Sequence, residues 1–337
     1  MIQMIKDAPT TIGITMGDPS GIGPEIILKS FGNSEIRDNR IIVIGDYNVM
    51  QAACKILKIN SFKLNRILYV QEAIFERGVL NILDLPLVNM NDLQPGKVQA
   101  GSGNAAFECI RKAVKLAENK DIDAIVTAPL NKEALHLAGH KFPGHTEILS
   151  SLTSTRDYAM LLYEKRLSVI HVSTHVSLLE AITGLRRERI EKVIELGNEA
   201  MKRLCANEPR IAVAGINPHA GENGLFGKEE INEIIPAVKN MKSLGINVVG
   251  PLPPDTVFLQ TLNGKYDLVV AMYHDQGHIP LKLIGFNSGV NVTAGLPFLR
   301  TSVDHGTAFD IAWEGKAKEE SMVEAIKLSI KLVQSSS

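Results

Sequence analysis

Short apolar runs alternate with stretches of helical periodicity along almost the whole chain. The runs are rich in Val, Ile and Ala, which is typical of strands buried on both faces. We expect strands at residues 11–16, 41–44, 124–127, 158–163, 167–172, 211–215, 246–249 and 268–272. Apolar positions recur with the helical period at 104–119, 187–204, 228–243 and 318–333. The alternation predicts an α/β fold with a mostly parallel sheet and crossover helices.

Length and composition narrow the class of protein. The 337 residues predict about two domains, and no repeat, low-complexity tract or Pro/Gly/Ser-rich linker marks their boundary. A formal net charge of −1 offers no field for nucleic acid or anionic lipid. The cysteines are odd in number and lack CxxC spacing, so we expect Cys54, Cys109 and Cys205 to be reduced core residues. The N-terminal residues have no secretory h-region and no apolar run approaches the ~20 residues of a membrane span, so we expect a soluble, cytoplasmic protein.

The stretch 266–312 carries more polar chemistry than a core segment needs. His274 and Asp275 follow the predicted strand 268–272, and ligands of open α/β sheets bind beyond the carboxyl ends of strands. The stretch also contains Lys282, Asn291, Arg300, Asp304, His305 and Asp310. We therefore place the chemistry of the chain here.

Three histidines follow three different predicted strands. His175 comes after 167–172, His219 after 211–215 and His274 after 268–272. Each alone is more often a hydrogen-bonded structural histidine. Strand ends of one sheet line the same crevice, however, and three imidazoles with open positions make a catalytic site for Zn or another borderline divalent ion. There is no HExxH motif and no Cys pair.

A glycine-rich loop at 17–25 follows the first predicted strand, and Pro24 suits the first position of a helix. Such a turn onto a helix can cradle an anion. The loop matches neither GxGxxG nor the P-loop, because Ile26 replaces the last glycine and no GK[ST] follows. The pattern favours a structural turn, with phosphate binding as the alternative, and it argues against conventional dinucleotide binding.

The segment 138–147 ends in His145 and Thr146, which look like a helix start after Gly144. One interpretation makes Thr146 an N-cap whose hydroxyl accepts from a backbone amide. The other makes His145 and Thr146 ligands of a substrate anion. The sequence leaves both open.

Eight ordered blocks resemble the 4-hydroxythreonine-4-phosphate dehydrogenase family: GDPSGIGPEI, APLNKE, GHTEIL, HVSTHVSL, NPHAGENGLFGKEE, GPLPPDTVF, YHDQGHIPLK and GVNVTAGLPFLRTSVDHGTAFDIA. The resemblance implies a two-domain subunit of the isocitrate and isopropylmalate dehydrogenase type, with an interdomain active-site cleft. It places residues 1–130 and 300–337 in an outer domain with the cofactor segment, and 131–299 in a second domain with the metal ligands. It also implies a homodimer whose metal is bound by His175 and His219 of one subunit and His274 of the other.

The same resemblance implies substrate contacts at His145, Thr146, Lys282, Asn291 and Arg300. These types suit a phosphorylated hydroxy acid, since Arg holds an oxyanion bidentately and Lys adds a compact charge. The alternative for the two cations is a surface ion pair or a packed stem. Asp255 is the tentative catalytic residue. It and Asp275 either orient a metal ligand or its water, or are turn residues.

The segment DHGTAFDIA is similar to the adenosine-binding HG[ST]AP segment of the isocitrate dehydrogenase type, which implies cofactor contacts at Asp304, His305, Gly306 and Asp310. A carboxylate at 310 accepts hydrogen bonds from a ribose 2′-hydroxyl and repels a 2′-phosphate, so NAD is expected rather than NADP. Phe309 in place of proline and Trp313 in place of glycine depart from the motif.

The implied activity is a metal-dependent oxidation by NAD of a 4-phosphorylated 3-hydroxy acid to a 3-oxo acid, followed by decarboxylation, with Zn, Co, Mg or Mn as the ion. The expected substrate is 4-hydroxy-L-threonine 4-phosphate, which serves pyridoxal phosphate synthesis. The pair Gly277-His278 keeps 4-phospho-D-threonate or 4-phospho-D-erythronate as the alternative. Rivals from other classes are a phosphate acyltransferase and a metal-dependent sensor that binds phosphorylated acids without producing NADH.

Overall fold

The computed structural model describes residues 10–205, 208–285 and 288–335, which divide into two compact units. The first unit comprises 10–155 and 296–335, and the second comprises 156–295 without the two gaps. The sequence-based division at 130/131 and 299/300 assigned 131–155 to the second domain. These residues contain a short helix and a helix bearing His145, and in the structure they belong to the first unit.

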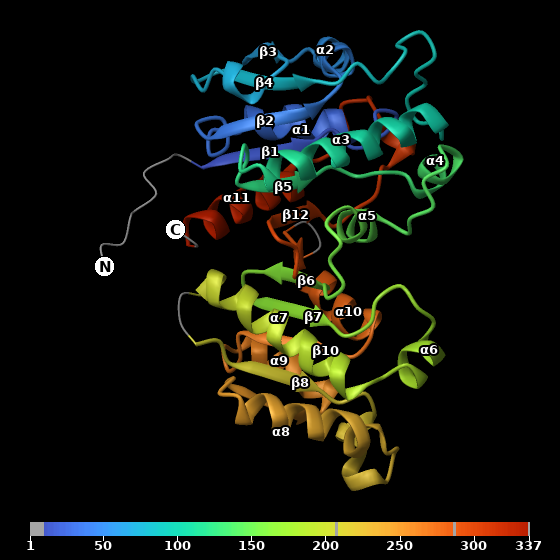
Figure 1. The fold of residues 1–337 in the computed structure, drawn as a ribbon, viewed down its shortest axis with the longest axis vertical. Helices are drawn as coiled ribbons and strands as arrows, with labels where there is room; N and C mark the ends of the chain where they lie inside the picture. Colours follow the sequence, from blue (N-terminus) through green and yellow to red (C-terminus); the bar gives the residue numbers. More distant parts are fainter. Residues whose placement is uncertain (1–9, 206–207, 286–287, 336–337) are drawn as a thin grey trace. The chain divides into compact units, whose positions relative to one another are not determined.

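The first unit is built on a parallel sheet in the order β3-β4-β2-β1-β5-β12. Its strands are β1 (Thr11–Thr15), β2 (Arg40–Gly45), β3 (Lys63–Ile67), β4 (Val79–Asp84), β5 (Ala124–Thr127) and β12 (Leu299–Val303). Its helices are α1 (Gly23–Gly32), α2 (Tyr47–Ile56), α3 (Ala100–Glu118), α4 (Lys132–Leu137), α5 (His145–Leu152) and α11 (Glu320–Gln334), with 3-10 turns η1 (Val70–Glu72) and η4 (Phe309–Ile311). Figure 1 shows α3 running across the strands β1, β2 and β5 on which it packs.

The second unit carries a mixed sheet in the order β11-β6-β7-β10-β8-β9. Its strands are β6 (Ala159–Glu164), β7 (Leu167–His171), β8 (Ile211–Ala214), β9 (Val248–Leu252), β10 (Leu268–Ala271) and β11 (Val290–Ala294). Its helices are α6 (Leu178–Thr183), α7 (Arg187–Cys205), α8 (Ile235–Ser243), α9 (Pro254–Leu262) and α10 (His274–Gly285), with a 3-10 segment η2 (Pro218–Gly224) and a π-helical turn η3 (Glu230–Ile234). Strands β7, β10, β8 and β9 are parallel, whereas β6 is antiparallel to both β7 and β11.

The mixed α/β class predicted from the sequence is confirmed, and the eight predicted strands correspond to β1, β2 and β5 to β10. Four strands were not predicted: β3, β4, β11 and β12. Strand β3 lies at the edge of its sheet and is mostly polar and partly exposed, so it lacks the apolar run of a buried strand. The predicted helix 228–243 is interrupted, because the π-helical turn precedes Pro236, which has no amide hydrogen to donate.

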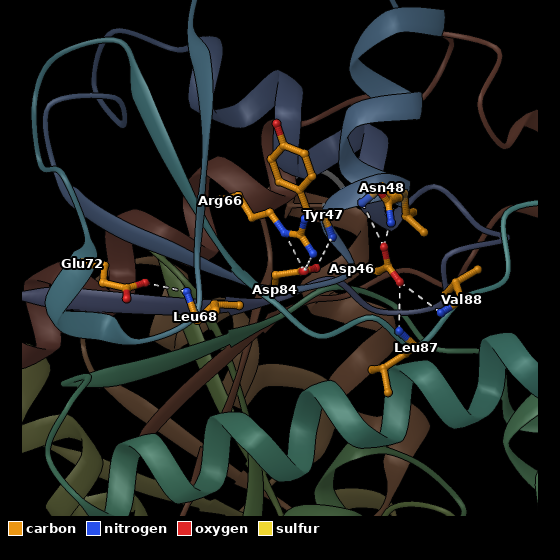
Figure 2. A network of polar contacts seen from close by, with 10 residues as sticks. Asp46, Tyr47, Asn48, Arg66, Leu68, Glu72, Asp84, Leu87 and Val88 are labelled. Carbon is orange, nitrogen blue, oxygen red and sulfur yellow. Dashed lines mark hydrogen bonds and ion pairs between the residues drawn. The ribbon is translucent and has the colours of Figure 1, made fainter.

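Two carboxylates near the carboxyl edge of the first sheet are structural. Asp46 caps α2 by accepting from the amide of Asn48 at 2.9 Å, and its other oxygen accepts from the amides of Leu87 and Val88 at 2.9 and 3.0 Å. Asp84 accepts from the amide of Tyr47 at 2.9 Å and also pairs with the guanidinium of Arg66. Figure 2 shows that these bonds join the ends of β2 and β4 to the next segments. Their oxygens are thus engaged in holding the loops.

Two remaining expectations concern cysteines and membranes. Cys54 and Cys109 are free thiols. Cys109 is buried as predicted, whereas Cys54 is only half-buried because its helix lies near the surface, and the side chain of Cys205 lies outside the described residues. Over the ranges that the structure describes, no helix combines the length and apolar character needed to cross a bilayer. The N-terminal residues 1–9, which were expected to lack a secretory h-region, also lie outside those ranges.

Candidate active site

The three predicted metal histidines lie at one edge of the second unit's sheet. Strand β10 pairs in parallel with β7 on one side and with β8 on the other. His175 follows the end of β7, His219 follows β8, and His274 follows β10. Three neighbouring parallel strands therefore deliver the imidazoles to the same carboxyl edge, which is where open α/β sheets bind ligands.

His175 and His274 share a pocket of about 320 Å³. Their ring centroids are 6.3 Å apart. The pocket is lined by Ser173, Thr174, His175, Val176, Leu178, Ala181, Tyr273, His274 and Asp275. It is therefore polar on the side of the two strand exits and apolar on the side of α6.

The His274 ring is held at its edge and on its face. Nδ1 lies 2.6 Å from Oδ1 of Asp275, and the His278 ring stacks on the His274 ring with centroids 3.6 Å apart and an interplanar angle of 12°. A carboxylate on one imidazole nitrogen fixes the tautomer and leaves the other nitrogen for a ligand, as in metal-bound histidines. Asp275 is thus a hydrogen-bond partner of His274, and its role in orienting a metal ligand stays a prediction.

His219 stands in an unusual loop. Residues 219 to 223 all have positive φ, including the non-glycine residues His219, Ala220, Glu222 and Asn223. The buried carboxylate of Glu230 supports the loop, with Oε1 accepting from the amides of Ile216 and Asn217 at 2.8 Å each. Left-handed conformations at non-glycine residues persist only when their surroundings fix them, and they cluster at functional sites. The His219 imidazole itself is exposed.

One chain does not assemble the three imidazoles into a metal site. Among the described residues no group of three or more His, Cys, Asp or Glu side chains is placed to hold a metal ion. The chemistry of the donor set nevertheless fits a borderline divalent ion, because imidazole suits Zn and its neighbours and Asp275 already engages Nδ1 of His274. His175, His219 and His274 are the residues that would hold it.

Two further histidines, His171 and His278, lie near His274. His171 was not singled out from the sequence, and His278 was noted only as part of the pair Gly277-His278. His171 is fully buried, its Nδ1 lies 3.2 Å from the carbonyl oxygen of Met160, and its Nε2 has no partner. Its ring is 4.7 Å from that of His278. A Cβ at position 277 would lie 2.4 Å from Nε2 of His171, so this arrangement requires Gly277. The i, i+4 spacing of His274 and His278 on one helix was the available signal.

In the first unit, the buried guanidinium of Arg300 and the half-buried His145 form a corner. Arg300 lies on β12, is 2 % exposed, and donates from Nη2 to the Thr127 hydroxyl at 2.6 Å. Burial lowers the pKa of its guanidinium to about 9, although the nearby Glu147 acts in the opposite direction. The surface ion pair considered for Arg300 is therefore wrong, because a buried guanidinium is not a solvated surface group.

His145 begins α5 beside this guanidinium. Burial, and then the charge of Arg300, lower the pKa of the imidazole to about 3, although a hydrogen bond to the backbone of Ala128 opposes the shift. Nε2 is buried and has no partner. A neutral ring with one engaged nitrogen keeps the other available to an incoming ligand.

Thr146 is the second residue of α5, so its prediction as an N-cap is wrong. The N-cap is Gly144, and no side chain caps this helix end. Gly144 has an extended backbone there, with a φ of 176° and a ψ of −169°. The buried Thr146 lies in the first turn, where helix amides lack intrahelical partners and favour anions.

The other two predicted substrate residues belong to the second unit. Lys282 is half-buried on α10, and Asn291 lies on β11 opposite Leu162 of β6. The Oδ1 atom of Asn291 is buried and has no partner. Asp255 lies exposed in the first turn of α9, a helix that packs beside η2 and thus beside the loop of His219.

The predicted cofactor residues follow β12 in the first unit. Asp304 is half-buried, while His305, Gly306 and Asp310 are exposed. Trp313, which departs from the adenosine motif, has a φ of 64°. Glycine adopts this conformation more readily than a residue with a side chain does. The chain accommodates tryptophan by burying it and letting Nε1 donate to the carbonyl of Pro19 at 3.0 Å.

The glycine-rich loop 17–25 is a structural turn whose amides are used within the protein. The Ser20 amide donates to Oδ1 of Asp18 at 2.8 Å, and the Gly21 amide donates to the Asp18 carbonyl at 3.0 Å. The Ile22 amide donates to the carbonyl of Thr307 at 3.0 Å. With these donors engaged, the loop does not present the amide cradle that a phosphate needs.

Comparison with known proteins gives consistent matches. Residues 37–329 match the family described as pyridoxal phosphate biosynthetic protein PdxA. D-threonate 4-phosphate dehydrogenase of Pectobacterium atrosepticum is 56% identical over 321 residues, covering 95% of this chain and 98% of that protein. The protein of the same name from Salmonella typhimurium is 54% identical over 322 residues, covering 96% and 98%. The crystal structure of 4-hydroxythreonine-4-phosphate dehydrogenase from Klebsiella pneumoniae superposes with a TM-score of 0.91 at 53% identity, covering 98% of this chain and 100% of that chain.

Proposed function

The chain belongs to the family of the pyridoxal phosphate biosynthetic protein PdxA, and on that premise we propose that it oxidises the 3-hydroxyl of a 4-phosphorylated acid with NAD and a divalent metal ion. Its named relatives are dehydrogenases, which makes it an oxidoreductase. The substrate that we put first is D-threonate 4-phosphate, the alternative that the pair Gly277-His278 had kept open.

The observation that carries the proposal is the corner formed by Arg300 and His145. His145 presents a buried Nε2 without a partner next to the buried guanidinium of Arg300, whose pKa is lowered by desolvation and raised by the nearby Glu147. A phosphate oxygen placed there receives charge-assisted hydrogen bonds from Arg300 and the amides of the first turn of α5. Thr146 adds a hydroxyl in the same turn.

The remaining predicted site residues bind the substrate or orient the metal-binding histidines. Lys282 adds a compact positive charge, and the Asn291 carboxamide offers a buried oxygen that accepts from a substrate hydroxyl. Asp275 engages Nδ1 of His274 and so leaves Nε2 for coordination together with His175 and His219. When bound, the divalent ion supplies Lewis acidity at the hydroxyl and NAD supplies the hydride acceptor. The product is a 3-oxo acid, which can lose CO2.

We propose further that the catalytic unit is a homodimer that shares its metal histidines. The described part of one chain does not gather the three imidazoles, and His175 and His219 are both exposed. Each histidine segment also carries a large exposed leucine: Leu179 at 70%, Leu225 at 71% and Leu283 at 81%. Exposed apolar side chains next to an incomplete polar site are typical of a surface that a partner covers, and a second copy would also supply the missing imidazole.

4-Hydroxy-L-threonine 4-phosphate is the second candidate. It is favoured by the Klebsiella protein, a 4-hydroxythreonine-4-phosphate dehydrogenase by name, whose sequence is nearly as similar to this chain as those of the D-threonate enzymes. Next to the reacting carbon, 4-hydroxy-L-threonine 4-phosphate has an amino group and D-threonate 4-phosphate has a hydroxyl. Both present the same phosphate to Arg300 and His145.

A spectrophotometric NADH assay tests the proposal. The panel contains D-threonate 4-phosphate, D-erythronate 4-phosphate, 4-hydroxy-L-threonine 4-phosphate and unphosphorylated D-threonate, each with and without chelator. We expect the highest kcat/KM for D-threonate 4-phosphate, little activity without the phosphate, and loss of activity with chelator. Absence of NADH with every phosphorylated acid, with metal added, would overturn the proposal.

A further inference from the structure

The glycine-rich loop 17–25 and helix α1 hold the candidate cofactor segment, which we define as residues 304–317. At its start, the Ile22 amide donates to the Thr307 carbonyl at 3.0 Å. In its middle, the indole of Trp313 donates to the Pro19 carbonyl at 3.0 Å. The loop thus binds the segment through its own backbone, although the two lie almost a whole chain apart in sequence.

Helix α1 holds the far end of the segment through an ion pair. The carboxylate of Glu25 is fully buried and accepts from the amides of Gly315 at 3.2 Å and Ala317 at 2.9 Å. Lys29 donates to the carbonyls of the same two residues at 2.8 and 2.6 Å and pairs with Glu25 at 2.7 Å. Donors and acceptors of one stretch of backbone are therefore satisfied by two side chains, one helical turn apart.

Close backbone approach explains two glycines. A Cβ at Gly21 would lie 2.9 Å from Cβ and 3.0 Å from the carbonyl oxygen of Thr307. A Cβ at Gly96, whose amide donates to the Ser20 carbonyl at 2.7 Å, would lie 2.8 Å from the carbonyl oxygen of Phe309. Side chains at these positions would displace the segment from its present place.

The residues of the cofactor segment do not by themselves favour its backbone conformation. Ala308 has a φ of 41° and Trp313 a φ of 64°, both in the left-handed region that non-glycine residues avoid. Such conformations persist only when the surrounding structure imposes them. The surroundings here are loop 17–25, Gly96 and α1.

We propose that loop 17–25 and α1 position the cofactor segment. Gly21 and Lys29 are then positioning residues for the binding of NAD and not for the binding of the phosphorylated acid. This inference rests on the proposed function, because it assumes that NAD binds at 304–310. It gives the glycine-rich loop a role in cofactor binding without any contact to phosphate.

Gly21→Ala tests the proposal against Gly32→Ala, a matched control on α1 where a Cβ meets nothing within 4 Å. Hydrogen exchange of 304–317 reports on the segment itself, and calorimetric titration with NAD measures binding. For Gly21→Ala we expect faster exchange in 304–317 and an increase of about tenfold in Kd and KM for NAD. The KM for D-threonate 4-phosphate and kcat at saturating NAD should stay at the wild-type values, as should every quantity for Gly32→Ala.

Trp313→Phe is the second variant, in case Gly21→Ala does not fold. It keeps an aromatic ring and removes the N–H that donates to Pro19. Trp313→Phe should likewise give faster exchange in 304–317 and a higher Kd and KM for NAD. Wild-type exchange in 304–317 and unchanged NAD affinity in the folded variants would overturn the inference while leaving the proposed function intact. Failure of the wild-type protein to bind NAD would instead overturn the proposed function and the cofactor role assigned to loop 17–25 and α1.

Discussion

The Arg300 guanidinium donates to the hydroxyl of Thr127 from the adjacent parallel strand, at 2.6 Å and away from solvent. Strands β12 and β5 thus aim a buried cation at the start of α5. Thr127 fixes the direction of the guanidinium, while the charge of the nearby Glu147 raises the pKa that burial lowers.

Arg300→Lys should raise the KM for the phosphorylated substrate roughly 10- to 100-fold, because the planar fork of donors is lost. Thr127→Val should have a smaller effect in the same direction, since it removes one positioning bond and leaves the cation. Steady-state kinetics with varied substrate measure both. Arg111→Lys, a change at an exposed helical ion pair, serves as the control. Equal KM values in Arg300→Lys and Arg111→Lys would show that Arg300 does not bind the substrate.

Asp275→Asn should weaken metal binding roughly 10- to 100-fold, because the amide no longer fixes the His274 tautomer as the carboxylate does. Metal content after dialysis and calorimetric titration with Zn²⁺ and Co²⁺ measure this directly. Asp38→Asn is the control, because this exposed carboxylate pairs only with Arg77 in the described structure. Retention of wild-type metal affinity by Asp275→Asn would show that Asp275 is a turn residue.

Mixing His175→Ala and His274→Ala subunits should restore activity that neither variant has alone. If the metal site takes His175 from one subunit and His274 from the other, each mixed dimer has one intact site. Random mixing then gives about a quarter of the wild-type rate. The assay is NADH production after co-refolding, with His175→Ala mixed with wild-type protein as the reference. No recovery on mixing, in dimers verified by mass, would place all three ligands within one chain.

Asp18→Asn should reduce the dependence of stability on pH. Burial raises the pKa of Asp18 from 3.8 to about 7, against two backbone hydrogen bonds that lower it. Between these values the folded protein holds a proton that the unfolded chain has released, so raising the pH lowers the free energy of unfolding. From pH 5 to 7 the wild-type protein should lose roughly 2 kcal/mol more than the variant. Denaturant unfolding at both pH values checks this, and parallel curves for the two proteins would show that Asp18 ionises normally.

Asp310→Lys should shift cofactor preference toward NADP, because a cation attracts the 2′-phosphate that a carboxylate repels. We expect kcat/KM for NAD to fall roughly tenfold and that for NADP to rise. Glu314→Lys, which makes the same charge change at an exposed position nearby, separates a local contact from the general field. A ratio of NADP to NAD activity that is the same in both variants would argue against a contact at position 310.

The class of fold and the family could both be predicted from the sequence alone. The alternation of apolar runs and helical periods depends on neighbours within one element, so β1, β5 and β10 were found within a residue or so of their ends. The ordered motif blocks likewise led to the family, since they depend only on residue identity. Polar edge strands such as β3 were missed, because their pairing and not their pattern makes them strands.

Tertiary structure decided what those motifs do. Whether the amides of loop 17–25 face a phosphate or a carbonyl depends on Thr307 and Trp313, which arrive from the other end of the chain. Whether Arg300 is a surface cation or a buried one depends on what packs around it, as does the neutral state of His145. Periodicity records which face of an element is buried, but burial of charge and the choice of hydrogen-bond partner arise from contacts between distant residues.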